Sequence, residues 1–305
     1  MNIVGKRYWF FGLSLLIIIP GLIALLLFGL PLAIDFTGGA LLELQFTSAP
    51  PAEDTIRSIY AQHGVEVDAV QNIGQNGLQI RSQEMSDQTR ADILSALREQ
   101  DSQFTELQFS SVSASISAEV VKQAALTVFI ATGGILLYLW YAFRQLPHAF
   151  RYGAAAVLAM LHDVAVVVGT AAILGKLFGW EVNALFLTAL LTVIGFSVHD
   201  TIVVFDRIRE NLARQRNLPY EAIVNHSIVQ TLTRSINTQL TAFFMLLALA
   251  LFGGLSVVHF VVALIIGILS GTYSSIFNAA PILVVWENRE WRTWFRRRRA
   301  IRQTV

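Results

Sequence analysis

The sequence contains no cysteine and few charged residues. Charged side chains make up 14% of the 305 residues, hydrophobic ones make up 54%, and the mean hydropathy is +0.57. Soluble domains average about 25% charged and about 45–50% apolar residues, so this composition indicates an integral membrane protein. The lack of cysteine excludes disulfides, thiolate metal sites and cysteine nucleophiles. The lack of cysteine does not indicate whether the polar parts of the chain lie on the oxidising or the reducing side of a membrane.

Motifs for nucleotide and metal chemistry are also missing. The chain has no GxxxxGK[ST] phosphate loop, which excludes a P-loop ATPase, and its histidines lack metal-ligand spacing. The glycine-rich stretches GGILLYLWYAFR and GGLSVVHF are apolar and favour close helix packing rather than phosphate binding. We therefore predict no cofactor, no metal site, no nucleic-acid partner and no enzymatic activity.

Six apolar segments are long enough to cross a bilayer, which requires roughly 20 residues. The first is too long for a signal peptide and is interpreted as an uncleaved anchor. Pro281 in the last segment indicates a kinked or interfacial end. The expected spans are Tyr8–Leu30, Val120–Phe143, Tyr152–Leu174, Asn183–Phe205, Thr231–Phe252 and Val257–Val285.

Lysine and arginine gather on alternate connections. The N-terminus, the 144–151 loop, the 206–230 segment and the tail from Trp286 are basic, whereas the connections between them are not. The positive-inside rule then predicts that both termini are cytoplasmic and that residues 31–118 are extracytoplasmic. The predicted parts are an N-terminus with the first helix (1–30), an outside domain (31–118), helices two to six (119–285) and a basic tail (286–305).

The basic tail contains a run of four arginines, Arg296–Arg299. Such a run next to a membrane span favours contact with anionic lipid head groups. Contact with a ribosome or another cytoplasmic partner is the alternative.

Residues 31–118 have the pattern of a small α+β domain. Strands are predicted at 41–48, 65–73, 77–82 and 105–117, and helices at 51–64 and 86–100. The order strand, helix, two strands, helix, strand is that of a ferredoxin-like fold. No catalytic constellation occurs in this segment, so we interpret it as a binding or mechanical module.

Ionisable residues inside the predicted spans are the main functional candidates, because a charge in lipid is costly. Asp200 lies six residues before Asp206, roughly 9 Å from the expected cytoplasmic border. Arg234 enters the next span from the same side, about one turn beyond Thr231. The two charges therefore lie at similar depth on consecutive antiparallel helices, and we predict that they pair.

Polar residues accompany this predicted pair. Asn237, Thr238 and Thr241 follow Arg234 at helical spacing, which predicts a polar stripe on one face of the fifth span. Ser197 lies one turn from Asp200 and can face the same way, whereas His199 points roughly 100° away and is at most supporting. Inside lipid such a stripe must face protein or water.

Two interpretations of the pair stay open. A buried Asp–Arg pair can simply fix helix packing. Alternatively, an Asp whose Arg partner moves changes its proton affinity with conformation, as ion coupling requires. His162 and Asp163 form a second polar pair near the middle of the third span, and a histidine there can serve in hydrogen bonding between helices alone.

Four motifs resemble those of the SecD/SecF family of protein-export membrane proteins, in the order and at the spacing of that family. The last two are the most specific, and together with the six spans the resemblance covers essentially the whole chain. The motifs are AIDFTGGALLELQF (33–46), LAMLHDVAVVVG (158–169), GFSVHDTIVVFDRIREN (195–211) and TLTRSINTQLTAF (231–243).

The resemblance implies an accessory subunit of the bacterial Sec translocase in the cytoplasmic (inner) membrane, with an RND-transporter-like membrane part. Its partners would be SecD, the SecYEG translocon with further accessory subunits, and the translocating polypeptide. The subunit would use the proton motive force to assist late steps of export.

By motif match, Asp200 and Arg234 correspond to the family's residues linked to proton transport. The family motif at the start of the outside domain matches Asp35, Phe36, Thr37, Gly38 and Gly39.

Two other functions remain open. One is an RND-like small-molecule transporter subunit, although such exporters normally have larger outside domains and a duplicated chain of twelve spans. The other is a membrane scaffold without ion coupling. Whether the coupling ion is H⁺ or Na⁺ also stays open, because one aspartate can serve either.

Overall fold

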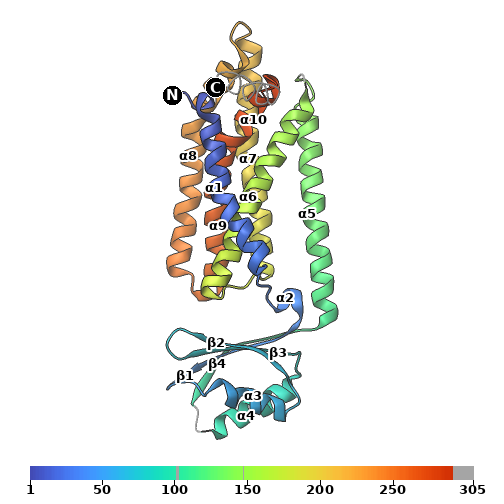
Figure 1. Ribbon diagram of the computed structural model, residues 1–305, viewed down its shortest axis with the longest axis vertical. Coiled ribbons are helices and arrows are strands. Elements are labelled where there is room, and N and C mark those ends of the chain that lie inside the picture. The colour runs from blue at the N-terminus through green and yellow to red at the C-terminus, as the bar shows by residue number, and fades with distance from the viewer. Residues whose placement is uncertain (101–102, 147, 291–305) are drawn as a thin grey trace, which may run out of the picture. The chain divides into compact units, whose positions relative to one another are not determined.

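The computed structural model describes residues 1–100, 103–146 and 148–290. The chain divides into two compact units (Figure 1). One comprises Leu32–Leu126, and the other comprises Met1–Pro31 with the chain from Thr127 onward. The arginine run Arg296–Arg299, with its expected lipid contact, lies outside the described residues.

The Leu32–Leu126 unit has the predicted α+β order. After the short helix α2, four strands form one sheet in the order β2-β3-β1-β4, with antiparallel neighbours throughout. This is the ferredoxin-like arrangement expected from the sequence. The elements are α2 (Ile34–Thr37), β1 (Gly39–Phe46), α3 (Glu53–Gln62), β2 (Val67–Ile73), β3 (Gly77–Ser82), α4 (Asp87–Glu99) and β4 (Phe104–Val112).

Alternation along the strands gives this unit its core. In β1, every second side chain from Ala40 to Phe46 is buried, and Leu42 and Leu44 are fully enclosed. The helices α3 and α4 cover that face of the sheet (Figure 1), and α4 begins where the hydroxyl of Ser86 accepts a bond from the amide of Thr89 at 3.1 Å.

The last strand is shorter than predicted. Of residues 113–117, expected to be strand, Ser113 precedes the helix α5 (Ala114–Ala142) and the other four form its first turn. The hydroxyl of Ser113 accepts a bond from the amide of Ile116 at 3.4 Å, which satisfies one of the free amides in the first turn. Serine side chains readily form such hydrogen bonds at the start of a helix. The segment that follows Ser113 is therefore helical despite its alternating pattern of polar and apolar residues.

The membrane unit confirms the prediction of six spans, since six helices are long and apolar enough to cross a bilayer. They are built from α1 (Arg7–Phe28), α5, α6 (Ala149–Phe178), α7 (Ala184–Arg214), α8 (Tyr220–Phe252) and the consecutive α9 (Leu255–Ser274), π-helix η2 (Ser275–Ala279) and α10 (Ala280–Glu287).

The fourth and fifth helices are longer than the predicted spans. α7 continues nine residues beyond Phe205 to Arg214, and α8 begins at Tyr220 rather than Thr231. The segment 206–230, expected to be a polar connection, is therefore mostly helical. Ion pairs one turn apart support the extension of α7, because Arg209 contacts Asp206 at 2.5 Å and Arg214 contacts Glu210 at 2.8 Å.

The last span changes helical register in its middle. The five-residue π-helix Ser275–Ala279 separates α9 from α10, and Pro281 lies in the first turn of α10. Proline has no amide hydrogen and its ring clashes with the carbonyl four residues earlier, so the α-helical bonding pattern is interrupted here. The irregularity that Pro281 predicted is thus a π-helix within a continuous span.

α9 packs against α6, α7 and α8, and α1 lies against α6 (Figure 1). At one point of the contact between α1 and α6 the two backbones meet directly, because the Cα atoms of Gly21 and Gly169 face one another. A Cβ atom on Gly21 would lie 2.8 Å from the Cα atom of Gly169. Small residues allow this close approach of two membrane helices.

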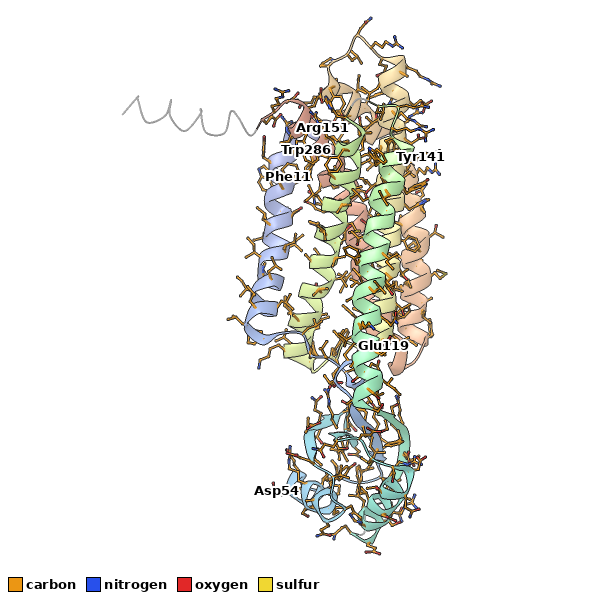
Figure 2. All side chains as sticks on the ribbon, turned by 90° about the vertical axis from the view of Figure 1, so that its right-hand side faces the viewer. Phe11, Asp54, Glu119, Tyr141, Arg151 and Trp286 are labelled. Atoms are coloured by element: carbon orange, nitrogen blue, oxygen red, sulfur yellow. The ribbon has the colours of Figure 1, made fainter. Side chains whose placement is uncertain are left out.

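Charged residues join several helices at the end of the bundle where α1 begins, which we call the N-terminal end. Arg7 binds Glu290 at 2.5 Å and Glu221 at 2.9 Å. Arg151 binds Glu287 at 2.7 Å, beside Trp286 at the same end (Figure 2). These pairs tie the starts of α1, α6 and α8 to the end of α10.

Candidate ion-coupling site within the membrane-spanning helices

Asp200 is buried between α7 and α8. Its side chain is 3% exposed, and its Oδ2 atom accepts a hydrogen bond of 2.6 Å from the Nε2 atom of Gln239. The other amide atom of Gln239, Oε1, is buried and has no hydrogen-bond partner among the described residues. The carboxyl group is thus held by one neutral amide.

Arg234 is not the residue that contacts Asp200. Its side chain is exposed on the outer surface of α8, and the structure shows no hydrogen bond or ion pair for it within the described residues. Arg234 and Gln239 are five residues apart, so they point about 140° away from each other around a helix with 3.6 residues per turn. The predicted direct pairing of Asp200 with Arg234 is therefore absent.

The predicted polar stripe lies on the same exposed surface of α8 as Arg234. Asn237, Thr238 and Thr241 are all exposed, and the two threonine hydroxyls donate to carbonyl groups of their own helix. His199 on α7 is exposed as well.

A second polar face of α8 points inward. Four polar residues at intervals of four, Ser227, Thr231, Ser235 and Gln239, are buried. Ser227 accepts a bond of 2.8 Å from the amide of Asn211 on α7, and the hydroxyl of Ser235 has no partner among the described residues. The face runs from Gln239, beside Asp200, toward the N-terminal end of the bundle. We call it the buried polar face of α8.

Ser197 contacts Asp163 instead of Asp200. Its hydroxyl donates to the Oδ2 atom of Asp163 at 2.6 Å, while its carbonyl accepts from Thr201 at 3.0 Å and from Ser275 at 3.1 Å. The interior of the bundle therefore holds two separate acids, one on the α8 side of α7 and one on the α6 side.

Asp163 is fully buried at the middle of α6 and accepts four hydrogen bonds. Besides Ser197, Ser274 donates to its Oδ2 atom at 2.6 Å, and Ser270 donates to its Oδ1 atom at 2.6 Å. The Nδ1 atom of His162 lies 3.0 Å from Oδ1. The donors come from α6, α7 and α9, so this acid joins three helices.

Sequence reasoning missed several of these partners. It did not select Gln239, Ser235, Ser270, Ser274 or Ser275. The spacing of Thr231, Ser235 and Gln239 could have revealed the buried polar face, since residues four apart share one side of a helix. The serines of α9 carry no such signal, because only the packing of α9 against α6 brings them to Asp163.

The family motif begins the Leu32–Leu126 unit. Gly38 and Gly39 have φ values of 76° and 110°, in the left-handed region that favours glycine. A Cβ atom on Gly39 would lie 2.6 Å from the carbonyl oxygen of Ser82 on β3. Thr37 donates to the carbonyl of Ala33 at 3.2 Å. The two glycines thus allow the chain to turn from α2 into β1.

No group of three or more His, Cys, Asp or Glu side chains is placed to hold a metal ion in the described part of the chain. Among the described residues, the buried polar groups inside the spans are hydroxyls, amides, the imidazole of His162 and the carboxyls of Asp163 and Asp200. These groups can hold and pass protons, and their oxygens can also hold a small monovalent cation.

The model of the family "Protein export membrane protein SecD/SecF, C-terminal" matches residues 92–289, and the "SecD/SecF GG Motif" matches residues 23–50. The chain belongs to the SecD/SecF family. The Protein translocase subunit SecF of Anaerolinea thermophila is 52% identical over 303 residues, covering 97% of both chains. The subunit of the same name from Synechocystis is 39% identical, covering 85% of this chain and 83% of the relative.

Solved structures of SecDF proteins support the same fold. The crystal structure of SecDF from Thermus thermophilus superposes with a TM-score of 0.81 at 33% identity, covering 94% of this chain and 39% of that one. In Bacillus subtilis the related protein is also named SecDF, and the match covers 95% of this chain and 38% of the relative. The SecD/SecF chain described here therefore corresponds to one part of these longer proteins.

These matches confirm the predicted fold class, a six-span RND-like membrane part with a small α+β domain. They make the chain a multi-pass membrane protein of a family involved in protein export. The relatives are named as translocase subunits, and the SecD/SecF family is one of non-catalytic membrane proteins.

Proposed function

We propose that this chain works with a SecD subunit and uses the proton motive force to assist late steps of polypeptide export. Asp200 is the group that takes up and releases the coupling ion. The observation that carries this proposal is the position of Asp200, a carboxyl inside a membrane span with a single amide as its hydrogen-bond partner among the described residues. A buried carboxyl with a strong cationic partner would be locked in its charged form.

Gln239 suits either protonation state of Asp200. Its Nε2 atom donates to a carboxylate, as the structure has it at 2.6 Å. When Asp200 is protonated, a half-turn of the amide brings the unpartnered Oε1 atom into position to accept the new O–H. The two side chains can therefore keep one hydrogen bond between them whether or not Asp200 carries a proton.

The buried polar face of α8 offers a route for the released ion. It leads from Gln239 through Ser235 and Thr231 to Ser227 and Asn211. These side chains lie where the interior would otherwise be apolar. We place the N-terminal end of the bundle in the cytoplasm because the basic residues gather there. Both termini are then cytoplasmic and residues 31–118 extracytoplasmic, across the bacterial inner membrane.

The exposed polar stripe of α8 supports a protein partner. Arg234 lies 18 residues before Phe252, roughly 27 Å along the helix axis, which is within a hydrocarbon core about 30 Å thick. A cation facing lipid costs about 2.5–3.5 kcal/mol at the centre of a span and less near the edge, where Arg234 lies. We infer that SecD covers this surface. Arg234 then acts on Asp200 through space, by its charge, and not through the direct ion pair expected from the sequence.

In this scheme, each proton passage at Asp200 switches the packing of α7 and α8. The Leu32–Leu126 unit, with the outside domain of SecD, turns that switch into holding or pulling of the emerging polypeptide near the SecYEG translocon. Residues Asp35–Gly39 act as the connection between the first span and the sheet.

The test uses vesicles that contain the complex with SecD and the translocon. In Asp200→Asn, export stimulated by the proton motive force should fall to the level seen with the gradient collapsed, while export that depends on ATP alone remains. Gln239→Leu should lower the stimulation, and Asp206→Asn at the exposed end of α7 serves as the control. Full stimulation in Asp200→Asn would contradict the proposal and favour a scaffold. Repeating the assay with a sodium gradient decides between H⁺ and Na⁺.

A further inference from the structure

The six residues before α1 fold back against the bundle at its N-terminal end (Figure 1). Val4–Lys6 form a single turn of 3₁₀-helix, η1. Ile3 is 2% exposed and Val4 is fully buried, whereas Met1 is 77% exposed. Residues 1–6 therefore place two apolar side chains inside the membrane unit, although they precede the first span.

The side chains of Ile3 and Val4 belong to a buried apolar cluster at this end of the bundle. The other members of the cluster come from α5, α6, α7, α8, η2 and α10. Its members on α8 are Val224, three residues before Ser227, and Ile228, directly after it. The buried polar face of α8 thus ends against the cluster to which Ile3 and Val4 contribute.

One side chain of α8 holds the backbone of this segment. The Oδ1 atom of Asn225 accepts hydrogen bonds from the amides of Ile3 at 2.8 Å and Val4 at 3.2 Å. Its Nδ2 atom donates to the carbonyl of Met1 at 2.9 Å. Asn225 therefore satisfies backbone groups before and in the first turn of η1, where a helix has no partners of its own.

Arg7 provides a second attachment beside the first. Its Nη1 atom donates to the carbonyl of Val4 at 2.8 Å and contacts Glu221 at 2.9 Å. Glu221 and Asn225 are four residues apart, so they lie on the same side of α8. The segment is thus fixed to α8 at both of its ends, and the apolar side chains lie between the two attachments.

A hollow of about 430 Å³ lies beside this segment. Met1 and Asn225 line it, together with other residues of α8 and of the turn between α7 and α8. A water molecule occupies about 30 Å³ of the liquid, so the hollow has room for several. Water can therefore reach the bonds of Asn225 and the outer side of residues 1–6.

We propose that residues 1–6 form a seal between this hollow and the buried polar face of α8, and that the seal opens when the segment leaves Asn225. The apolar side chains of Ile3 and Val4 keep water from the hydroxyls behind them. Ser227 is fully buried and Thr231 is 7% exposed, and such hydroxyls take up water once a path to it exists.

The hydrogen bonds of Asn225 make the seal reversible. When the segment moves into the hollow, the amides of Ile3 and Val4 and the side chain of Asn225 can bond to water instead. The apolar contacts favour the closed state, and the hollow provides the space for the open one. That the sealed face carries the coupling ion rests on the proposed function; the sealing itself does not.

The experiment measures the access of a water-soluble reagent to the buried polar face. The chain has no cysteine, so Thr231→Cys introduces a single reporter one turn beyond Ser227. The full chain is assembled with SecD in lipid nanodiscs, and the rate of modification by a small methanethiosulfonate reagent is measured. Adding Asn225→Ala should raise this rate by about tenfold or more, because the segment loses three hydrogen bonds.

Two controls separate sealing from a general loosening of the bundle. Asn217→Ala replaces an exposed asparagine in the turn before α8 and should leave the rate at Thr231→Cys unchanged. Asp206→Cys places the reporter on a side chain that is 56% exposed, and its rate should be high with or without Asn225→Ala.

Equal rates at Thr231→Cys with and without Asn225→Ala would overturn the proposal. A rate at Thr231→Cys as high as that at Asp206→Cys in the otherwise unchanged chain would overturn it as well. If Asn225→Ala does not assemble, Val4→Ser, which removes an apolar side chain from the seal, decides by the same comparison. The expected rates together with full gradient-driven export in Asp200→Asn would remove the proposed function and leave the seal in place.

Discussion

The contact between Gly21 on α1 and Gly169 on α6 allows a quantitative test of the bundle. A Cβ atom on Gly21 would lie 2.8 Å from the Cα atom and 3.2 Å from the carbonyl carbon of Gly169. Both atoms belong to the backbone of α6, so no side chain can move aside. Ordinary contact begins at 3.4 Å, and the helices would have to separate by at least 0.6 Å.

Gly12 provides a matched control on the same helix. A Cβ atom there meets nothing within 4 Å. Replacing a glycine inside a helix by alanine gains about 0.5–1 kcal/mol of helix stability. Overpacking a contact costs about 1–3 kcal/mol. Gly21→Ala should therefore be less stable than Gly12→Ala by about 1–3 kcal/mol, with the helix preference cancelling in the comparison.

The free energy of unfolding can be measured in mixed micelles by titrating a denaturing detergent and following tryptophan fluorescence. Gly169→Ala, the partner position, should lose a similar amount, and Gly21→Ala combined with Gly169→Ala should cost less than the sum of the two, because the first substitution already separates the helices. If Gly21→Ala were as stable as Gly12→Ala, the close approach of α1 and α6 would be wrong.

Two further predictions concern the N-terminal end and the Leu32–Leu126 unit. Partial burial opposes ionisation of Glu290, but hydrogen bonds from Arg7, Tyr8 and Asn288 hold its pKa below the usual glutamate value. The ionised side chain therefore stabilises the fold fully above the ordinary glutamate pKa. This stabilisation is lost as the pH falls through the lowered pKa of Glu290 in the folded state. Unfolding measured from pH 7 to pH 3 should show this loss in the wild type, and Glu290→Gln should flatten it; an unchanged profile would contradict the assigned bonds. Leu42→Ala in the fully buried row of β1 should destabilise the sheet by about 2–5 kcal/mol, whereas Leu107→Ala, 61% exposed on β4, should change stability by less than about 0.5 kcal/mol. Equal protection of the sheet amides in both variants, measured by hydrogen exchange, would argue against the packing.

Patterns that repeat over many residues were predictable from the sequence. The spans follow from long apolar runs, and the sheet unit from alternation in β1 and from the helical segments 51–64 and 86–100. These patterns depend on residues close together in the chain, so tertiary packing does not alter the structure that they predict. The end of α7 was not predictable in the same way, because hydropathy marks the edge of the lipid rather than the end of a helix, and the ion pairs around Glu210 carried the helix further.

The candidate site was predicted in its residues but not in its contacts. Asp200 was found from the cost of a charge in lipid. The opposite charge of Arg234 predicted it as the partner of Asp200. In the structure, α8 is rotated so that Gln239 faces Asp200 instead. Asp163 and Ser197 were both identified, yet their bond depends on how α6 and α7 pack. A single sequence shows which residues share a face of each helix. It does not show how each helix is rotated about its axis where it packs against another.

The exposed position of Arg234 has a consequence for the subunit on its own. A copy that has inserted without a partner carries a cation and an amide, Asn237, on an outer helix surface at a depth where lipid is apolar. Assembly with a partner removes that charge from lipid, so the same residue that serves the complex makes the solitary subunit the less stable form in the membrane. In the proposed complex, the cost of placing Arg234 in lipid therefore falls on the unassembled copy and favours its assembly with the partner.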